Sequence, residues 1–223
     1  MSRSGRRGVR VKICGLCRPE DARVAAEAGA DYLGVVFAGE RRQRTLEQAR
    51  SIWKGLAVPR VGVFVDAAAA ELIRLAEALD MSAIQLHGEE PPDECGRIRS
   101  AGPWAVWKAI RIDEGVDVLG AVDRYAGVVD AVLLEGRSAL GHGGVGARFE
   151  WSSVADRAGW PAALDVVLAG GLRPENVARA IAVARPDVVD VSSGVESEVG
   201  RKDAGRIRAF LDAVRAAERE GVA

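Results

Sequence analysis

The chain has 223 residues, of which 48% are hydrophobic and 28% charged, the composition of a globular protein that can bury a substantial core. Lys and Arg number 31 against 32 Asp and Glu, so the net charge of −1 gives no basis for binding nucleic acid or an anionic membrane surface. No apolar run reaches the roughly 18 residues of a membrane span, and the basic start MSRSGRRGVRVKI lacks the apolar segment of a secretory signal. Three cysteines make no disulfide framework, so the sequence predicts a cytoplasmic protein.

Short β-branched runs alternate with longer segments of helical periodicity, the pattern of repeated βα units around a parallel sheet. The expected strands are 9–15, 31–37, 60–65, 83–88, 105–111, 131–135, 165–170 and 187–193. The expected helices are 20–29, 45–56, 68–79, 91–101, 115–126, 151–158, 174–184 and about 203–218.

Eight strands, each followed by a helix, are the count of a single-domain (β/α)₈ TIM barrel of the α/β class. An open doubly wound sheet usually has fewer strands and needs a glycine-rich turn after the first one, where ICGLCRPEDA has a single glycine. We assign residues 9–223 to the barrel and 1–8 to a flexible basic leader. Active sites of such barrels lie at the carboxyl ends of the strands.

Two glycine-containing loops predict a phosphate site. LAGGLRPENV ends the seventh strand with Gly170 and Gly171, and DVSSGVE ends the eighth with Ser193 and Gly194. Glycines let the backbone approach an anion closely, and barrels commonly bind phosphate in the loops after these two strands. Tight turns are the alternative interpretation of either loop alone.

Cys14 ends the first strand and is a candidate general base. Lys12 has the same strand parity, so both side chains should point into the barrel, where an ammonium group and the nearby end of the first helix would favour the thiolate. A small buried hydrophobic residue is the alternative role for Cys14. Cys14 and Cys17 spell C-x-x-C, but without a second pair no metal site is expected, and a redox dithiol lacks a thioredoxin-like context.

Three further strand ends carry candidate site residues. Glu135 follows the apolar run AVLL, where burial would raise its pKa toward that of a general acid, unless it pairs with an arginine. ERRQR at 40–44 puts three arginines after the second strand, where a guanidinium can bind a carboxylate. His87 ends the fourth strand and is a candidate for substrate binding. The glycine-rich loop after Glu135 could close over a ligand, with His142 as a solvated residue.

VKICGL, VGVFVDA, QLHGEE, LAGGLRPENV and DVSSGVESEVGRKD, in this order over residues 11–203, resemble the phosphoribosylanthranilate isomerase family. The resemblance implies an Amadori rearrangement of N-(5-phosphoribosyl)anthranilate in tryptophan biosynthesis, without metal or organic cofactor. It makes Cys14 the general base and Glu135 the general acid. It also implies that Arg42 binds the anthranilate carboxylate and that Gly170, Gly171, Ser193 and Gly194 bind the phosphate.

The sequence departs from the family pattern at the rim of the expected pocket. This sequence has LLE where the family usually has LLD, and GGVG where it usually has GGTG or GGSG. It has ERRQRTLEQ where the family has a loop more like SPRYVSPE. These changes leave open a paralogue that isomerises another N-phosphoribosyl arylamine, or a barrel that binds phosphosugars without catalysis. The histidine-pathway isomerase is disfavoured because that family usually has an aspartate where Cys14 stands. The sequence does not decide between a monomer and a homodimer.

Overall fold

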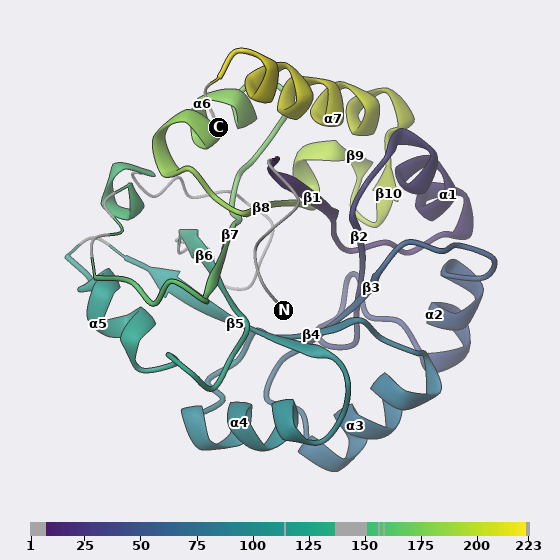
Figure 1. Ribbon diagram of the computed structural model, residues 1–223. Coiled ribbons are helices and arrows are strands. Elements are labelled where there is room, and N and C mark those ends of the chain that lie inside the picture. The colour runs from purple at the N-terminus through teal and green to yellow at the C-terminus, as the bar shows by residue number, and fades with distance from the viewer. Residues whose placement is uncertain (1–7, 114, 137–150, 156, 158, 222–223) are drawn as a thin grey trace.

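Eight parallel strands close into a barrel in the computed structural model, which describes residues 8–113, 115–136, 151–155, 157 and 159–221 (Figure 1). The strands are β1 Arg10–Ile13, β2 Tyr32–Val36, β3 Arg60–Phe64, β4 Ala83–Leu86, β5 Ala105–Ile112, β6 Ala131–Gly136, β7 Asp165–Leu168 and β8 Val188–Val191. Each strand pairs with the next in sequence, and β1 pairs with β8 from Arg10↔Val188 to Ile13↔Val191. The expected fold class is confirmed.

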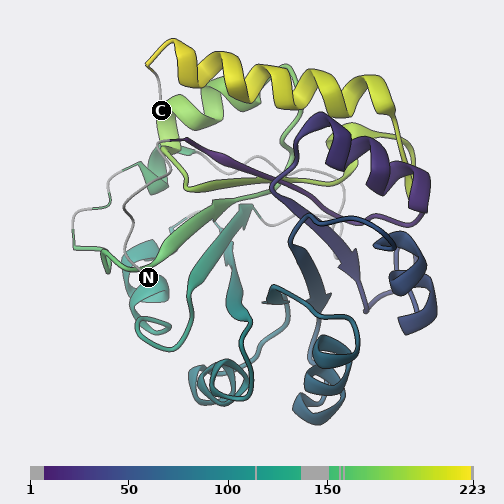
Figure 2. The same cartoon turned by 45° about the vertical axis from the view of Figure 1, so that its right-hand side comes forward.

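Helices form the outer layer of the barrel, with α7 lying against both α6 and α1 (Figures 1 and 2). They are α1 Pro19–Ala28, α2 Leu46–Ile52, α3 Ala69–Ala78, α4 Pro92–Ser100, α5 Val118–Asp123, α6 Val177–Ala184 and α7 Ala204–Arg219. Local signals set several ends. A capping box between Thr45 and Gln48 starts α2, and the Asp203 side chain accepts from the Arg206 N–H to start α7. Most helices are shorter than the sequence predicts.

Two segments differ from the predicted elements. Where a helix was expected over 151–158, the described residues form only the 3₁₀ helix η1, Trp151–Val154. After β8 the chain forms a second 3₁₀ turn, η2 Ser193–Val195, and a hairpin of β9 Glu196–Glu198 and β10 Arg201–Lys202 that the sequence did not predict. Strands of two or three residues carry too little periodicity to be found in a sequence.

Strand parity determines what fills the barrel. Inward-facing side chains of the strands form a buried apolar cluster, separate from the larger core between strands and helices. This cluster includes Val61, Trp107, Leu133 and Val167. Nearer the carboxyl ends of the strands the inward-facing side chains become polar, beginning with the fully buried Lys12. The polar layer therefore lies above a packed floor, at the end of the barrel where active sites form.

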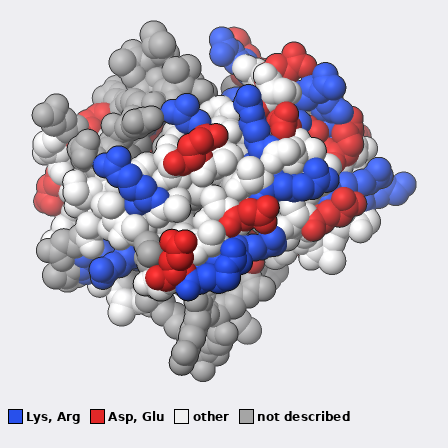
Figure 3. Space-filling model, turned by 90° about the horizontal axis from the view of Figure 1, so that it is seen from above, with Lys and Arg blue, Asp and Glu red and all other residues white. Residues whose placement is uncertain are grey.

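Two predicted features lie outside the described residues. These are the leader, apart from Gly8, and most of the glycine-rich loop after Glu135, with His142 in it. Within the described ranges no helix is long and apolar enough to cross a membrane. The face in Figure 3 carries interspersed acidic and basic side chains, in line with the near-neutral net charge.

Candidate active site

Cys14 lies just beyond β1, inside the barrel and close to the Lys12 ammonium group. Lys12 reaches across the interior, and its Nζ atom donates to Gln85 Oε1 at 2.8 Å and to Asp190 Oδ2 at 3.0 Å. Gly34 on β2 gives this arrangement room, because a Cβ atom there would lie 3.0 Å from both Cys14 Sγ and Lys12 Cε. The parity argument for Cys14 and Lys12 is confirmed.

The pKa of Cys14 differs from the expectation. Burial raises the pKa of this thiol and Asp190 adds to the increase, and together they outweigh the Lys12 and Lys202 cations that lower it. Lys12 is already neutralised by Asp190, so it stabilises a thiolate less than a free cation would. The expected low thiol pKa is therefore wrong for the free protein, in which Cys14 carries its proton at neutral pH.

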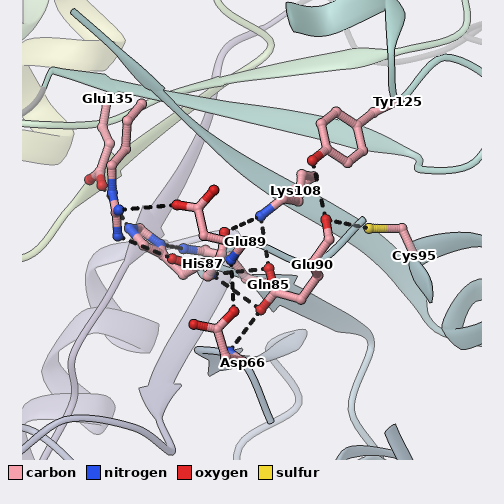
Figure 4. A network of polar contacts seen from close by, with 11 residues as sticks. Asp66, Gln85, His87, Glu89, Glu90, Cys95, Lys108, Tyr125 and Glu135 are labelled. Carbon is pink, nitrogen blue, oxygen red and sulfur yellow. Dashed lines mark hydrogen bonds and ion pairs between the residues drawn. The ribbon is translucent and has the colours of Figure 1, made fainter. Parts of the chain in front are cut away.

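Glu135 lies on β6 and is hydrogen-bonded to His87, which follows β4 (Figure 4). Glu135 Oε1 lies 2.7 Å from His87 Nε2, and His87 Nδ1 lies 2.9 Å from Gln85 Nε2. A continuous chain of polar contacts thus joins Asp190, Lys12, Gln85, His87 and Glu135. It connects the element that carries the candidate base to the one that carries the candidate acid.

The pKa of Glu135 also shifts against the expectation. Burial by itself raises the pKa of this carboxyl, as the sequence predicted. Against burial act the hydrogen bond that His87 donates and the nearby charges of Arg111 and Lys12, and the pKa lies below its ordinary value. The apolar run AVLL predicts the apolar strand below Glu135. It carries no information about the partners of the Glu135 carboxyl group, which come from other strands. In the free protein Glu135 is a carboxylate at neutral pH.

Arg42 is held by two hydrogen bonds to a carboxylate. Its Nε atom donates to Glu196 Oε1 at 2.8 Å and its Nη2 atom to Glu196 Oε2 at 2.6 Å, while Lys202 Nζ lies 3.0 Å from Glu196 Oε1. The Arg42 stem passes over Gly15, where a Cβ atom would lie 2.7 Å from Arg42 Cδ. The guanidinium group is close enough to Cys14 for the two side chains to interact electrostatically. Within the described ranges its Nη1 atom has no partner and is free to bind an anion.

The loops after β7 and β8 are in contact with one another. Gly170 and Gly171 both have positive φ, at 86° and 66°, and neither backbone N–H donates a hydrogen bond to another described residue. A Cβ atom on Gly194 would lie only 1.9 Å from the Leu172 carbonyl oxygen, so only glycine allows the two loops to approach this closely. Free N–H groups on a close-packed glycine backbone are suited to holding an anion.

The chain closely resembles proteins of one family over almost its whole length. A family model described as N-(5'phosphoribosyl)anthranilate (PRA) isomerase matches residues 11–213. The chain belongs to this family. An N-(5'-phosphoribosyl)anthranilate isomerase of Pseudomonas aeruginosa strain LESB58 is 43% identical over 215 residues, which cover 95% of this chain and 98% of that protein. One of Pseudomonas putida strain W619 is 45% identical over 94% of this chain and 98% of its own length.

Solved structures agree with the assignment to the phosphoribosylanthranilate isomerases. The enzyme of Thermotoga maritima superposes with a TM-score of 0.82 at 38% identity, covering 93% of this chain and 99% of that one. The enzyme of Thermus thermophilus gives a TM-score of 0.81 at 36% identity with the same coverage. Another isomerase of the family, solved in complex with reduced 1-(o-carboxyphenylamino)-1-deoxyribulose 5-phosphate, gives 0.79 at 37% identity over 93% and 99% of the two chains.

Several members of this isomerase's polar layer were not predicted from the sequence. Gln85 and Glu196 stand inside motifs quoted for the resemblance, QLHGEE and DVSSGVE, yet no role was assigned to either. Lys202 comes from the unpredicted hairpin. Alternation along the fourth strand could have placed Gln85 on the same face as His87, whereas the pairing of Glu196 with Arg42, 154 residues away, has no local signal. Among the described residues no cluster of His, Cys, Asp or Glu could hold a metal ion.

Proposed function

We propose that Cys14 and Glu135 are the base and the acid with which this family member isomerises N-(5'-phosphoribosyl)anthranilate, a step of tryptophan biosynthesis. The observation that carries the proposal is the polar layer itself, because both groups lie at the carboxyl end of one barrel. Cys14 interacts with Lys12, and a chain of hydrogen bonds runs from Lys12 through Gln85 and His87 to Glu135. A fluorescence assay that follows consumption of freshly prepared phosphoribosylanthranilate tests it. No consumption by folded protein would contradict it.

The reaction assigns one proton transfer to each residue. Glu135 gives a proton to the ribose ring oxygen, the bond from C1′ to that oxygen breaks, and the nitrogen lone pair forms a protonated Schiff base. Cys14 then removes the proton from C2′, and the electrons of that bond form the enolamine, which relaxes to the ketose. One acid, one base, a phosphate anchor and a carboxylate clamp suffice.

The pKa directions define how the two residues share protons. The free protein holds Cys14 as a thiol and Glu135 as a carboxylate, because burial raises the pKa of Cys14 and His87 helps to lower that of Glu135. The reactive form, a thiolate and a carboxylic acid, contains the same number of protons. Transfer of one proton from Cys14 to Glu135 therefore converts the resting form into the reactive one without exchange with solvent.

A second candidate substrate is the phosphoribosyl derivative of another arylamine. The observation that favours it is Glu135 in place of the family aspartate, next to an arginine-rich loop of unusual sequence. Comparing kcat/KM for phosphoribosylanthranilate with that for amines bearing other ring substituents separates the two. If the protein only binds phosphosugars, it should bind phosphoribosylanthranilate without converting it. The oligomeric state, monomer or homodimer, and the cytoplasmic location stay predictions. A relative from Thermotoga maritima is described as dimeric.

Arg42 is expected to bind the substrate carboxylate through its free Nη1 atom. Arg42→Ala should weaken binding by about 1.5–3 kcal/mol, the value of a charged hydrogen bond, which raises KM about 10- to 150-fold with a smaller change in kcat. Steady-state kinetics measure this, with Arg44→Ala in the same loop as the matched control. A substrate made from aniline, which has no carboxylate, should show little effect of Arg42→Ala. If Arg44→Ala causes the loss of binding instead, Arg44 and not Arg42 is the residue that binds the substrate carboxylate.

Gly170, Gly171, Ser193 and Gly194 are expected to hold the substrate phosphate. Gly171→Asp places a carboxylate where N–H groups would face a dianion, and should raise KM steeply. Gly171→Ala is the matched control, since it introduces the strain of a side chain at a φ of 66° without the charge. Equal KM values for the two variants would contradict a phosphate site here, as would a phosphate-soaked crystal with the anion bound elsewhere and these loops empty.

A further inference from the structure

We propose that His87 is a positioning residue for Glu135. Lys12 sets the tautomer of His87 through Gln85, and His87 then leaves Oε2 as the Glu135 oxygen that carries the catalytic proton. The inference deepens the proposed function, because it rests on Glu135 being the acid. It is argued from the order of hydrogen-bond donors and acceptors along the side chains of Lys12, Gln85, His87 and Glu135.

Lys12 fixes the direction of the first link. Its ammonium group can only donate, so the Gln85 atom at 2.8 Å must be the amide oxygen. The second partner of Lys12 is Asp190 Oδ2 at 3.0 Å, and both residues are buried, Lys12 completely. An amide turned the other way would place its NH₂ group against the ammonium group. The orientation of Gln85 therefore follows from hydrogen-bond chemistry.

Gln85 fixes the tautomer of His87. With its oxygen on Lys12, the amide presents its NH₂ group to His87 Nδ1 at 2.9 Å, so this nitrogen must be the acceptor. A proton on Nδ1 would face another donor, and Gln85 cannot turn away without facing Lys12 with the wrong group. The hydrogen-bond order therefore places the ring proton of His87 on Nε2.

His87 in turn orients Glu135. Its Nε2–H group donates to Glu135 Oε1 at 2.7 Å and occupies that oxygen. With Nδ1 accepting from Gln85 and Oε1 accepting from His87, the acidic form of Glu135 carries its proton on Oε2, which has no hydrogen-bond partner among the described residues. The acid is thus protonated at the carboxyl oxygen that is not hydrogen-bonded to His87.

The backbone around His87 is held firmly enough to maintain this geometry. The His87 N–H donates to the Phe64 carbonyl at 2.8 Å, and the next turn is fixed by the buried pair of Lys108 and Glu90, with Nζ and Oε2 2.8 Å apart (Figure 4). Among the described residues, the charged groups around the ring are Glu135 on β6, Arg111 on β5 and, through Gln85, Lys12 and Asp190. The Arg111 Nη2 atom lies 3.5 Å from the His87 carbonyl oxygen.

The test combines ¹⁵N NMR of histidine with kinetics. The chain has two histidines, so ¹⁵N-histidine-labelled protein gives a simple spectrum, and His142→Gln assigns the signals. We expect the free enzyme to show His87 as the neutral Nε2–H tautomer at neutral pH. Gln85→Glu keeps the shape but presents only acceptors, so it should move a proton onto His87 Nδ1. It should lower kcat by about 10- to 100-fold, part of what a general acid supplies, with little change in KM. Gln85→Met, which leaves both tautomers open, should lose less.

The outcomes separate this inference from the proposed function. An imidazolium or an Nδ1–H tautomer in the wild-type spectrum overturns the inference even if Glu135 proves essential. Retention of wild-type kcat by Gln85→Glu, with the tautomer changed in the spectrum, overturns it as well. The expected tautomer together with full activity of Glu135→Gln leaves the hydrogen-bond order intact but removes its catalytic role, and in that case the proposed acid is the assignment that fails.

Discussion

Cys14→Ser should lower kcat by at least about 10³-fold, because a neutral serine hydroxyl is a far poorer base than a thiolate. The side chain lies in the polar layer beside Lys12 and Asp190, and serine is close enough in size to keep the barrel folded. Assays with phosphoribosylanthranilate measure the loss, and thermal unfolding confirms folding. Cys17→Ser is the matched control, since Cys17 lies in the same loop, and it should keep activity within a few-fold. Cys14→Ser within tenfold of wild type would remove Cys14 from the mechanism.

The pH profile gives a second test of the Cys14 assignment. The resting and reactive forms hold the same number of protons, so kcat/KM should be level across neutral pH. It should fall at high pH as the Cys14 thiol loses its proton, and at low pH as the Glu135 carboxylate gains one. Because burial raises the pKa of Cys14, the alkaline limb should lie above the ordinary thiol value of about 8.5. A limb below that value would contradict this direction.

Glu135→Gln should reduce turnover by about 10²- to 10⁴-fold, the contribution of a general acid, because an amide has the same shape but no proton to give. Asp190 is the alternative candidate acid. It lies in the same layer, its Oδ1 atom is buried without a hydrogen-bond partner among the described residues, and it is the next acid to test. Near-normal turnover of Glu135→Gln would eliminate Glu135, and Asp190→Asn would then be the variant that loses activity.

Glu135→Asp asks whether the pocket has adapted to the longer acid. The glutamate reaches His87 with Oε1 2.7 Å from Nε2, a contact that an aspartate on the same strand would be too short to keep. We therefore expect Glu135→Asp to lose activity by up to about a hundredfold, the cost of misplacing a catalytic group by about 1 Å. Higher activity of Glu135→Asp on phosphoribosylanthranilate would identify this chain as a drifted isomerase instead.

The sequence by itself determined the barrel and the face on which its site lies. Eight β-branched runs separated by helical segments have local periodicities, and strand alternation alone put Cys14 and Lys12 on one inward face. The paired glycines at 170 and 171 were equally visible, because a backbone with positive φ selects glycine locally. Each of these features depends on neighbours within a few positions in the chain.

Only the tertiary structure decided how the site is charged. Glu135 meets His87 across 48 residues and Arg42 meets Glu196 across 154, contacts that exist because β1 to β8 close into a ring. The apolar run before Glu135 predicted a raised pKa, and the neighbour of Cys14 predicted a lowered one. Both directions were wrong, since a pKa depends on every charge and dipole nearby in space and on burial, not on the residues nearby in sequence.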